Sequence, residues 1–475
     1  MIWQGATDLI EALDRRQVSS VELAERAITR IEACDGTINA VVVRDFERAL
    51  AAARQADETR RRGGAGALLG LPVTVKECFD VAGLPTTWGV AGSEKSLAPE
   101  DAVVVQRLKA AGAVVLGKTN VPVMLTDWQA ANPIYGVTSN PWNAARTSGG
   151  SSGGSAAALA AGFVALEVGS DLAGSIRVPA AFCGVYGHKP SYGLVPLRGA
   201  SPPGAPRLST MPAIDMAVAG PMARSAADLD LALDVLAGPD LDAAAYRLAL
   251  PPARHRTLRD HRVLVLDHHP LVPLQAAIRT RLNAVADDLI RAGCTVGREA
   301  PGLPDLRMVA RVFGRLLLSF AGADMPQQAY DEMRARASGT DDDPQTALTL
   351  SHRDWIVADR QRSWIRHLWR QVFGDWDIVL CPVTPTTAFP HDHRDQTVRT
   401  LAVDGREIPY NSQSIWCGIA NMAGLPATAL PAGLDADGLP IGLQAIGPHL
   451  EDRTTIAFVR LLAEAIGGFA PPPGY

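Results

Sequence analysis

The sequence predicts an α/β protein with a large, mixed and mostly parallel twisted central sheet that is covered by helices on both faces. Apolar, strand-like runs alternate with amphipathic segments of helical period, which is the pattern of such a sheet. The chain has 475 residues, 47% hydrophobic and 20% charged, enough for one large core. Because no internal repeat or low-complexity linker interrupts it, we expect a single domain over residues 1–475.

The N-terminal third alternates between helices and strands. Ser19-Ser20-Val21-Glu22 has the capping-box pattern, which predicts a helix from there to about Ala33. Residues 38–43 are strand-like, and a second helix is expected over 46–61, before a pair of glycines. The apolar run 71–75 then predicts a buried strand with Lys76 at its C-terminal end.

The rest of the chain continues the alternation. Helices are expected over 101–111 and 156–161, and strands over 113–116, 163–168 and 377–381. Residues 303–372 are helical in pattern and rich in Arg, Trp and Met, so we expect a helical layer or lid near the substrate pocket. Residues 421–444, punctuated by Pro and Gly, are expected to form closing strands and turns.

Charge and composition exclude several classes of function. The formal net charge is −5 and the isoelectric point about 6.1, so nothing favours binding to nucleic acid or to an anionic membrane. The longest apolar stretch, 156–166, is too short to span a bilayer, and the N-terminus lacks the pattern of a signal peptide. The six scattered cysteines contain no CxxC motif and are typical of a reduced, cytoplasmic protein.

Two serines surrounded by glycines are the strongest chemical signal. Ser151 lies in Gly149-Gly150-Ser151-Ser152-Gly153-Gly154, and Ser175 in the segment GSDLAGSIR at 169–177. Core packing does not require so many glycines beside serines. A hydrolase does require them when it attacks a carbonyl with serine and holds the oxyanion on bare backbone N–H groups.

Two better-known motifs also match but fit their contexts poorly. Residues 112–119 fit the P-loop pattern GxxxxGK[ST], yet their variable positions are Ala, Val, Val and Leu, which indicate a strand and a structural Lys118. Residues 149–153 fit the GxSxG nucleophile elbow, but the elbow must follow a strand, and residues 143–148 are polar without a β-rich run.

Taken together, these segments resemble the amidase signature family. The resemblance rests on GGSSGGS at 149–155, GSDLAGSIR at 169–177, the upstream GLPVTVK at 70–76 and GHKPSYGLVP at 187–196. Further matches are GKTN at 117–120, AGPMARS at 219–225, GLP at 424–426 and GLPIG at 438–442. The resemblance covers nearly the whole chain and implies the fold of that family. The separation of 24 positions between Ser151 and Ser175 is the family's own.

The resemblance implies a catalytic triad with Ser175 as nucleophile, Ser151 as bridging serine and Lys76 as base. It also implies a cis peptide bond between Gly150 and Ser151. Chemistry agrees with these roles, because a serine needs a base to take its proton and a lysine becomes a base when burial disfavours its charged form. Lys76 follows an apolar run, which makes burial reasonable.

The resemblance also implies an oxyanion hole and a supporting shell. The expected oxyanion donors are the backbone N–H groups of Leu172, Ala173 and Gly174, with a contribution from Ser175. Ala173 stands where many family members have glycine.

Around these groups, Asp171 and Arg177 are expected to form an ion pair and Ser152 to orient Lys76. Candidate substrate-binding residues are Met124, Leu125, Trp128 and Trp416, each of which is equally compatible with plain core packing.

These expectations lead to a cofactor-independent hydrolase. We expect it to cleave carboxylic amides through an acyl-enzyme on Ser175, with esters and carbamates (urethanes) as further small-molecule substrates. No metal is expected. The two short histidine clusters, His268-His269 and His391-Asp392-His393, are typical of solvated loops and not of metal ligands. The chain is expected to act as a monomer or homodimer.

Two alternatives remain. The chain could be the amidase-like subunit of a glutamine-dependent amidotransferase, which needs a cation for the glutamine carboxylate; the candidates are Arg307, Arg311 and Arg315. It could also be a non-catalytic relative that only binds amides, although its three catalytic positions are intact.

Overall fold

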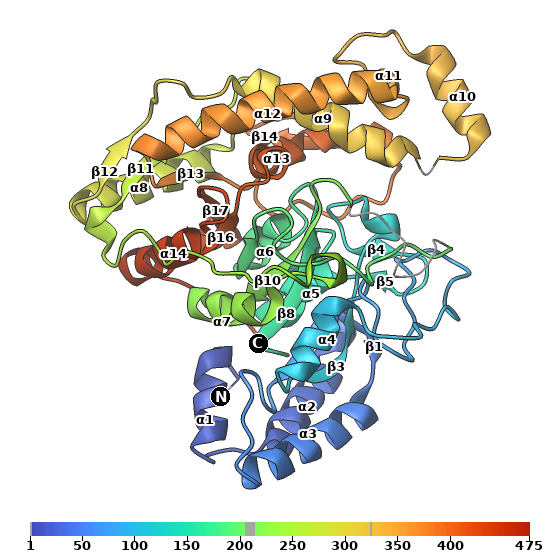
Figure 1. Cartoon of the computed structure of the whole chain (residues 1–475), viewed down its shortest axis with the longest axis vertical. Coiled ribbons are helices and arrows are strands. Elements are labelled where there is room, and N and C mark those ends of the chain that lie inside the picture. The colour runs from blue at the N-terminus through green and yellow to red at the C-terminus, as the bar shows by residue number, and fades with distance from the viewer. Residues whose placement is uncertain (1, 205–213, 324) are drawn as a thin grey trace.

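An eleven-stranded sheet forms the centre of the computed structural model, which describes residues 2–204, 214–323 and 325–475 (Figure 1). In spatial order the strands are β1 (Val41–Arg44), β3 (Val114–Thr119), β2 (Pro72–Lys76), β8 (Leu166–Asp171), β10 (Val218–Ala223), β9 (Tyr186–Lys189), β16 (Ala427–Leu434), β17 (Pro440–Ile446), β13 (Ile378–Pro382), β11 (Arg262–Val265) and β12 (Thr295–Gly297).

The predicted large mixed sheet is confirmed, but parallel pairing is in the minority. Four neighbouring pairs are parallel, namely β3–β2, β2–β8, β13–β11 and β11–β12. The other six pairs are antiparallel. Antiparallel neighbours need only a short connection, as between β16 and β17, whereas parallel neighbours need a crossover. Apolar runs in the sequence indicate burial on both faces but not strand direction.

Helices cover both faces, as predicted. One face carries α2 (Ser20–Ile38), α3 (Phe46–Arg61), α5 (Gly153–Ala160) and α6 (Arg177–Cys183), which share one apolar cluster. The opposite face carries α1 (Ala6–Asp14), α4 (Val103–Ala110), α7 (Ala226–Leu236), α8 (Ala276–Arg291) and α14 (Asp452–Ile466), which share another. None of the helices in the described ranges has the length and apolar character needed to cross a membrane.

Local sequence explains where the N-terminal elements begin and end. The Ser19 hydroxyl accepts the Glu22 N–H and the Glu22 carboxylate accepts the Ser19 N–H, which is the predicted capping box. The helix α2 runs past the predicted end to Ile38 and stops at Asn39, which has left-handed φ and ψ. The strand β2 is buried throughout and delivers Lys76 at its last position, as predicted.

A layer of helices lies beside one half of the sheet, at the top of the view in Figure 1. It contains α9 (Leu306–Ala323), α10 (Gln327–Arg336), α11 (Pro344–Leu348), α12 (His352–Asp375) and α13 (Ser414–Ala423). The helices α9, α12 and α13 pack around a third apolar cluster, in which Trp369 and Trp416 are wholly buried. The lid function predicted for residues 303–372 stays a prediction.

Small strands outside the main sheet add detail near the serines. A hairpin of β14 (Thr400–Val403) and β15 (Arg406–Pro409) leads through the short 3-10 turn η5 (Tyr410–Gln413) into α13. The strand β7 (Asn143–Thr147) pairs with β6 (Ser139–Asn140) just before the Gly149–Gly154 loop. The expectation of no strand in this segment is therefore wrong; its polar residues pair outside the central sheet, where no apolar run is needed.

Candidate active site

Lys76 lies at the centre of the site, at the end of β2. Its side chain is wholly buried, and its Nζ lies 2.6 Å from the Ser151 Oγ. The Nζ also donates to the Ser170 Oγ at 2.9 Å and approaches the Ser170 carbonyl oxygen at 3.5 Å. The lysine is therefore held between the bridging serine and the end of the neighbouring strand β8.

Burial is the largest influence on the charge of Lys76. It lowers the pKa of the Lys76 ammonium to about 8, although the nearby acidic groups of Cys78, Asp171 and Glu167 act in the opposite direction. A lysine with this pKa is neutral in about one-tenth of molecules at pH 7 and in about one-half at pH 8. It can therefore accept a proton, which an exposed lysine cannot do at that pH.

Ser151 occupies a backbone arrangement that the flanking glycines permit. The Gly150–Ser151 peptide bond is cis, as the resemblance implied. A Cβ at position 150 would lie 2.2 Å from the Asp127 carbonyl oxygen, so only glycine fits there. The close approach seats the Ser151 loop against the segment that contains Asp127 and Trp128.

The two serine loops are bound to each other through Ser152. Its backbone N–H donates to the Ser175 carbonyl oxygen at 3.1 Å, and its hydroxyl donates to the Ser170 carbonyl oxygen at 3.3 Å. Within the described ranges Ser152 forms no hydrogen bond to Lys76, but both side chains approach the Ser170 carbonyl oxygen, and the supporting role of Ser152 stays a prediction. Ser170, which has no role in the sequence-based prediction, contacts Lys76 instead.

Ser175 is the accessible member of the group. Its residue is partly exposed, whereas Ser151 is 1% exposed and Lys76 is fully enclosed. A nucleophile must be reached by substrate, and its base must be shielded from water to keep a low pKa. Exposure therefore falls from Ser175 through Ser151 to Lys76, which is the order predicted for the nucleophile, the bridging serine and the base.

The loop before Ser175 offers free backbone donors. Among the described residues, no backbone hydrogen bond takes up the N–H of Leu172, Ala173 or Ser175. The Gly174 N–H, by contrast, donates to the Asp171 Oδ1 at 2.9 Å, so Gly174 does not serve as a free donor as the sequence predicted. Ala173 does not have a positive φ, and alanine is unstrained at that position.

Asp171 and Arg177 form the predicted ion pair beneath this loop, and both are buried. The guanidinium donates through Nε and Nη2 to the two Asp171 oxygens, each at 3.0 Å. Burial alone would raise the pKa of Asp171, but the charge of Arg177 and its hydrogen bonds hold that pKa well below its usual range. Arg177 also donates to Gln444 at 2.7 Å and to Asn421.

A second buried carboxyl group, Glu167, lies one strand away from Lys76. Its Oε1 accepts the Thr119 hydroxyl at 2.8 Å, and Thr119 is the register partner of Lys76 in the β2–β3 pair. Burial raises the pKa of Glu167 to about 7. Sequence reasoning missed this residue, because a glutamate in a strand is ordinarily taken to be surface exposed.

The four substrate-binding candidates differ in accessibility. Met124 and Leu125 are partly exposed and have positive φ values of 51° and 61°, an unusual conformation for two consecutive non-glycine residues. Trp128 is 8% exposed and packs edge-on against Tyr410. Trp416 is wholly buried and packs against His269. A substrate contact at these residues stays a prediction.

The remaining motifs have structural explanations. Lys118 lies within the buried strand β3 and donates to Thr86 Oγ1 at 2.9 Å, so residues 112–119 form no phosphate loop. The prediction of solvated histidines is wrong for His269, which is 2% exposed because it packs against Trp416. In the described part of the chain, no group of three His, Cys, Asp or Glu side chains could hold a metal ion.

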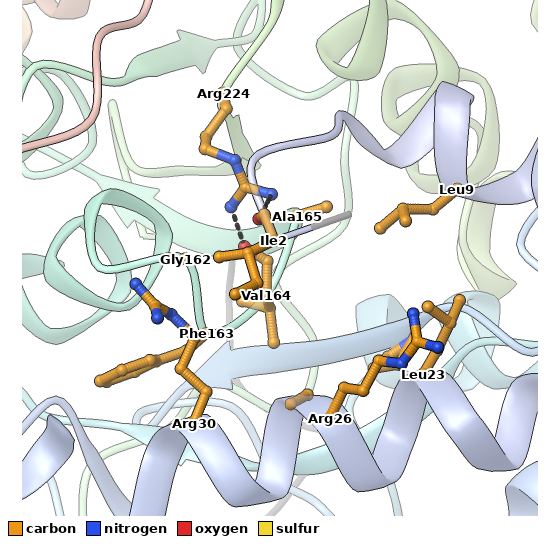
Figure 2. Close-up of a pocket in the computed structure, with 12 residues that line it drawn as sticks. Ile2, Leu9, Leu23, Arg26, Arg30, Gly162, Phe163, Val164, Ala165 and Arg224 are labelled. Carbon is orange, nitrogen blue, oxygen red and sulfur yellow. Dashed lines mark hydrogen bonds between the residues drawn. The ribbon is translucent and has the colours of Figure 1, made fainter. Parts of the chain in front are cut away.

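Two cavities lie outside the triad. The smaller one, about 60 Å³, is lined by Ile2, helix α2, residues 162–165 and Arg224, whose guanidinium donates hydrogen bonds to the Ile2 and Val164 carbonyl oxygens (Figure 2). Residues 162–165 precede β8, whereas Asp171 ends it, so this cavity lies at the opposite edge of the sheet from the serines. The larger one, about 630 Å³, is lined by the loop 386–394 and the β14–β15 hairpin, with Tyr410 on its wall.

Comparison with known proteins agrees with the geometry. The model of the family described as Amidase matches residues 22–456. The chain belongs to the amidase signature family. An indoleacetamide hydrolase of Bradyrhizobium diazoefficiens is 32% identical over 472 residues, which cover 95% of this chain and 84% of that protein.

Two further matches are an amidotransferase subunit and an aryl acylamidase of known structure. A glutamyl-tRNA(Gln) amidotransferase subunit of Methylococcus capsulatus is 33% identical, with 89% of each chain covered. A solved bacterial aryl acylamidase of the amidase signature family superposes with a TM-score of 0.81 at 26% identity, covering 98% of this chain and 96% of that one. The sequence prediction of an amide-cleaving hydrolase is therefore confirmed at the level of the family.

Proposed function

We propose that this amidase signature enzyme hydrolyses carboxylic amides through an acyl-enzyme on Ser175. The observation that carries the proposal is the buried contact of 2.6 Å between Lys76 Nζ and Ser151 Oγ, together with the lowered pKa of Lys76. A lysine that is neutral and hydrogen-bonded to a serine is a base, and a base is what a serine nucleophile requires.

In the first step, protons move from Ser175 to Ser151 and from Ser151 to Lys76. A neutral lysine amine has two N–H groups and one lone pair. The Ser170 hydroxyl and carbonyl oxygens accept N–H groups, at 2.9 and 3.5 Å, which directs the lone pair toward Ser151. The Ser175 oxygen then attacks the carbonyl carbon, and the proton returns through Ser151 to the leaving amine.

The negative charge that develops on the carbonyl oxygen needs donors that are already in place. The N–H groups of Leu172, Ala173 and Ser175 are free of other backbone partners among the described residues and supply them. The Asp171–Arg177 pair, fixed by Asn421 and Gln444, holds this loop rigid. Water then hydrolyses the acyl-enzyme by the same relay.

The substrate range is wider than amides in this proposal. Esters and aryl carbamates present the same carbonyl and a leaving group, so the same steps apply to them. We also propose a cytoplasmic location, which is supported by the cysteines: all six are free and five of them are buried.

The amidotransferase alternative has support from the relatives that are amidotransferase subunits and 33% identical to this chain. It needs a cation that is available to the glutamine carboxylate. Of the three candidates, Arg311 is already paired with Asp342 at 3.1 Å and Arg315 with Asp341, which leaves Arg307 to hold the carboxylate. Glutaminase activity, with a co-purifying partner protein, would favour the alternative.

The test uses matched anilide, ester and aryl-carbamate substrates that share one acyl group. Product release is compared between the wild type and Ser175→Ala, with circular dichroism as the control for folding. We expect the wild type to cleave at least the anilide and the variant to lose about a thousandfold or more in kcat. Activity that survives in a folded Ser175→Ala variant would overturn the assignment of the nucleophile.

A further inference from the structure

One face of the segment η5–α13 lies along both serine loops. Residues three or four apart share a helical face, so Tyr410, Gln413, Cys417 and Asn421 form one row along this segment. An adjacent face of α13 packs on α9, where a Cβ at Gly418 would lie 2.6 Å from the Phe313 ring. Asn421, in the same row, donates to the Asp171 Oδ1 at 3.0 Å, so the row faces the segment that carries Ser175.

The contacts of the row define its position. At one end, the Tyr410 hydroxyl donates to the Asp127 Oδ1 at 2.6 Å, and the Asp127 carbonyl oxygen abuts Gly150 of the Ser151 loop. Further along, a Cβ at Gly174 would lie 2.8 Å from the Cys417 Sγ, beside the Ser175 loop. Gln413 lies between these two contacts.

The side chain of Gln413 is buried but has no partner. Gln413 is 0% exposed, and neither its Nε2 nor its Oε1 forms a hydrogen bond to any described residue. Buried amides almost always satisfy both atoms, because an unpaired polar group in the interior is costly. An amide that is left unpaired beside a catalytic centre is expected to have its partner in the bound substrate.

Other buried glutamines of this chain show the ordinary situation. Gln129, 1% exposed, donates to the Asp392 carbonyl oxygen at 2.7 Å and accepts the Asp392 N–H at 2.8 Å. Gln444, also enclosed, accepts from Arg177 and donates to the Pro382 carbonyl oxygen at 2.9 Å. Gln413 differs from both although it is equally buried.

We propose that Gln413 is a specificity-determining residue that binds a second amide-type group of the substrate, one that offers both an N–H and a C=O next to the scissile bond. The inference rests on the proposed function and names the class of substrate for the same site. A carboxamide or N-acyl group can accept from Nε2 and donate to Oε1 together, whereas an alkyl chain leaves both atoms unpaired. Selectivity against the alkyl analogue follows, because such a site rejects groups that cannot pair.

The test uses two pairs of substrates matched in shape. On the acyl side, N-acetylglycine 4-nitroanilide is compared with 4-methylpentanoic acid 4-nitroanilide. On the leaving-group side, benzoylglycinamide is compared with N-isobutylbenzamide. We expect the wild type to prefer the amide-bearing member of one pair by about tenfold or more in kcat/KM, and Gln413→Leu to abolish that preference.

Thermal stability separates binding from a structural role. Gln413→Leu removes two unpaired polar atoms, so its Tm is expected to equal or exceed that of the wild type. The matched control Gln129→Leu breaks two hydrogen bonds that exist, so its Tm is expected to fall while the substrate preference remains.

Three outcomes decide against the proposal. Equal loss on both members of each pair in Gln413→Leu, a lowered Tm of that variant, or no preference in the wild type would each overturn it. Ser175→Ala in the same assay separates this failure from failure of the hydrolase. If Ser175→Ala keeps activity, the nucleophile is wrong; if only the preference is missing, the role of Gln413 is wrong.

Discussion

Activity should follow the neutral fraction of Lys76. The pKa of about 8 that burial gives this lysine sets the midpoint of the rise. The base must be unprotonated, so the rate increases as pH rises through that value. The neutral fraction is about one-tenth at pH 7 and about nine-tenths at pH 9, which predicts a roughly tenfold increase in kcat/KM and a plateau above pH 9.

The assay is the release of 4-nitroaniline from an uncharged anilide between pH 6 and 10, with kcat/KM taken at each pH, because this ratio reports the pKa of the free enzyme. A lysine without burial would place the midpoint near its ordinary pKa of about 10.4, with no plateau below pH 10. The control is Lys189→Met, because burial lowers the pKa of Lys189 to about 7 and its titration must be separated from that of Lys76. We expect the midpoint to stay near 8 in this variant. A flat profile between pH 6.5 and 9, or a midpoint that moves with Lys189, would refute the assignment of Lys76 as the base.

Three further substitutions test the shell around the triad. Glu167→Gln removes an acidic group that raises the pKa of Lys76, so the midpoint of the pH profile should move to lower pH; an unchanged or higher midpoint would show that Glu167 does not act on Lys76. Asp171→Asn leaves the buried Arg177 without its counter-charge, and urea unfolding should show a loss of about 3–5 kcal/mol; a loss below about 1 kcal/mol would contradict the structural role of this pair. Gly174→Ala places a Cβ 2.8 Å from the Cys417 Sγ at a φ of +109°, so stability should fall by about 1–3 kcal/mol and kcat should decrease, whereas a variant with unchanged kcat would show that the loop tolerates the shift.

The proposed catalytic residues can be picked out from local patterns in the sequence. The glycine-rich segments around Ser151 and Ser175 are local, and the apolar run before Lys76 predicts burial at the end of a strand. The structure brings Lys76 and Ser151 together because β2 lies next to β8, and Ser151 precedes the helix α5 that packs on those strands. The glycine-rich segments and the apolar run are each encoded within a few residues, which is why they can be recognised in the sequence, whereas the adjacency of β2 and β8 is not local.

The supporting contacts could not be predicted, since they join segments that are distant in the chain. Ser170 reaches Lys76 only because β8 pairs with β2. Asn421 and Gln444 meet Arg177 across more than 240 positions. The sequence also predicts more parallel strand pairs than the sheet contains. Apolar runs indicate that a strand is buried, but they do not indicate which strand it pairs with or in which direction.

The corrected oxyanion donor has a different cause. The motif places Gly174 beside Ser175, but only the position of the Asp171 carboxylate decides that the Gly174 N–H is already used. Hydrogen-bond competition of this kind depends on side-chain rotamers, which a sequence pattern does not contain.

The most direct test is to identify the serine that acts as nucleophile, because its oxygen displaces fluoride from a fluorophosphonate and keeps the phosphonyl group. The wild-type chain is incubated with a fluorophosphonate, digested and mapped by mass spectrometry, alongside Ser175→Ala and Ser151→Ala. We expect the adduct on Ser175 in the wild type, none in Ser175→Ala, and slower labelling of Ser175 in Ser151→Ala because the proton relay is broken. An adduct on Ser151 or on any other residue of the wild type would contradict the central claim.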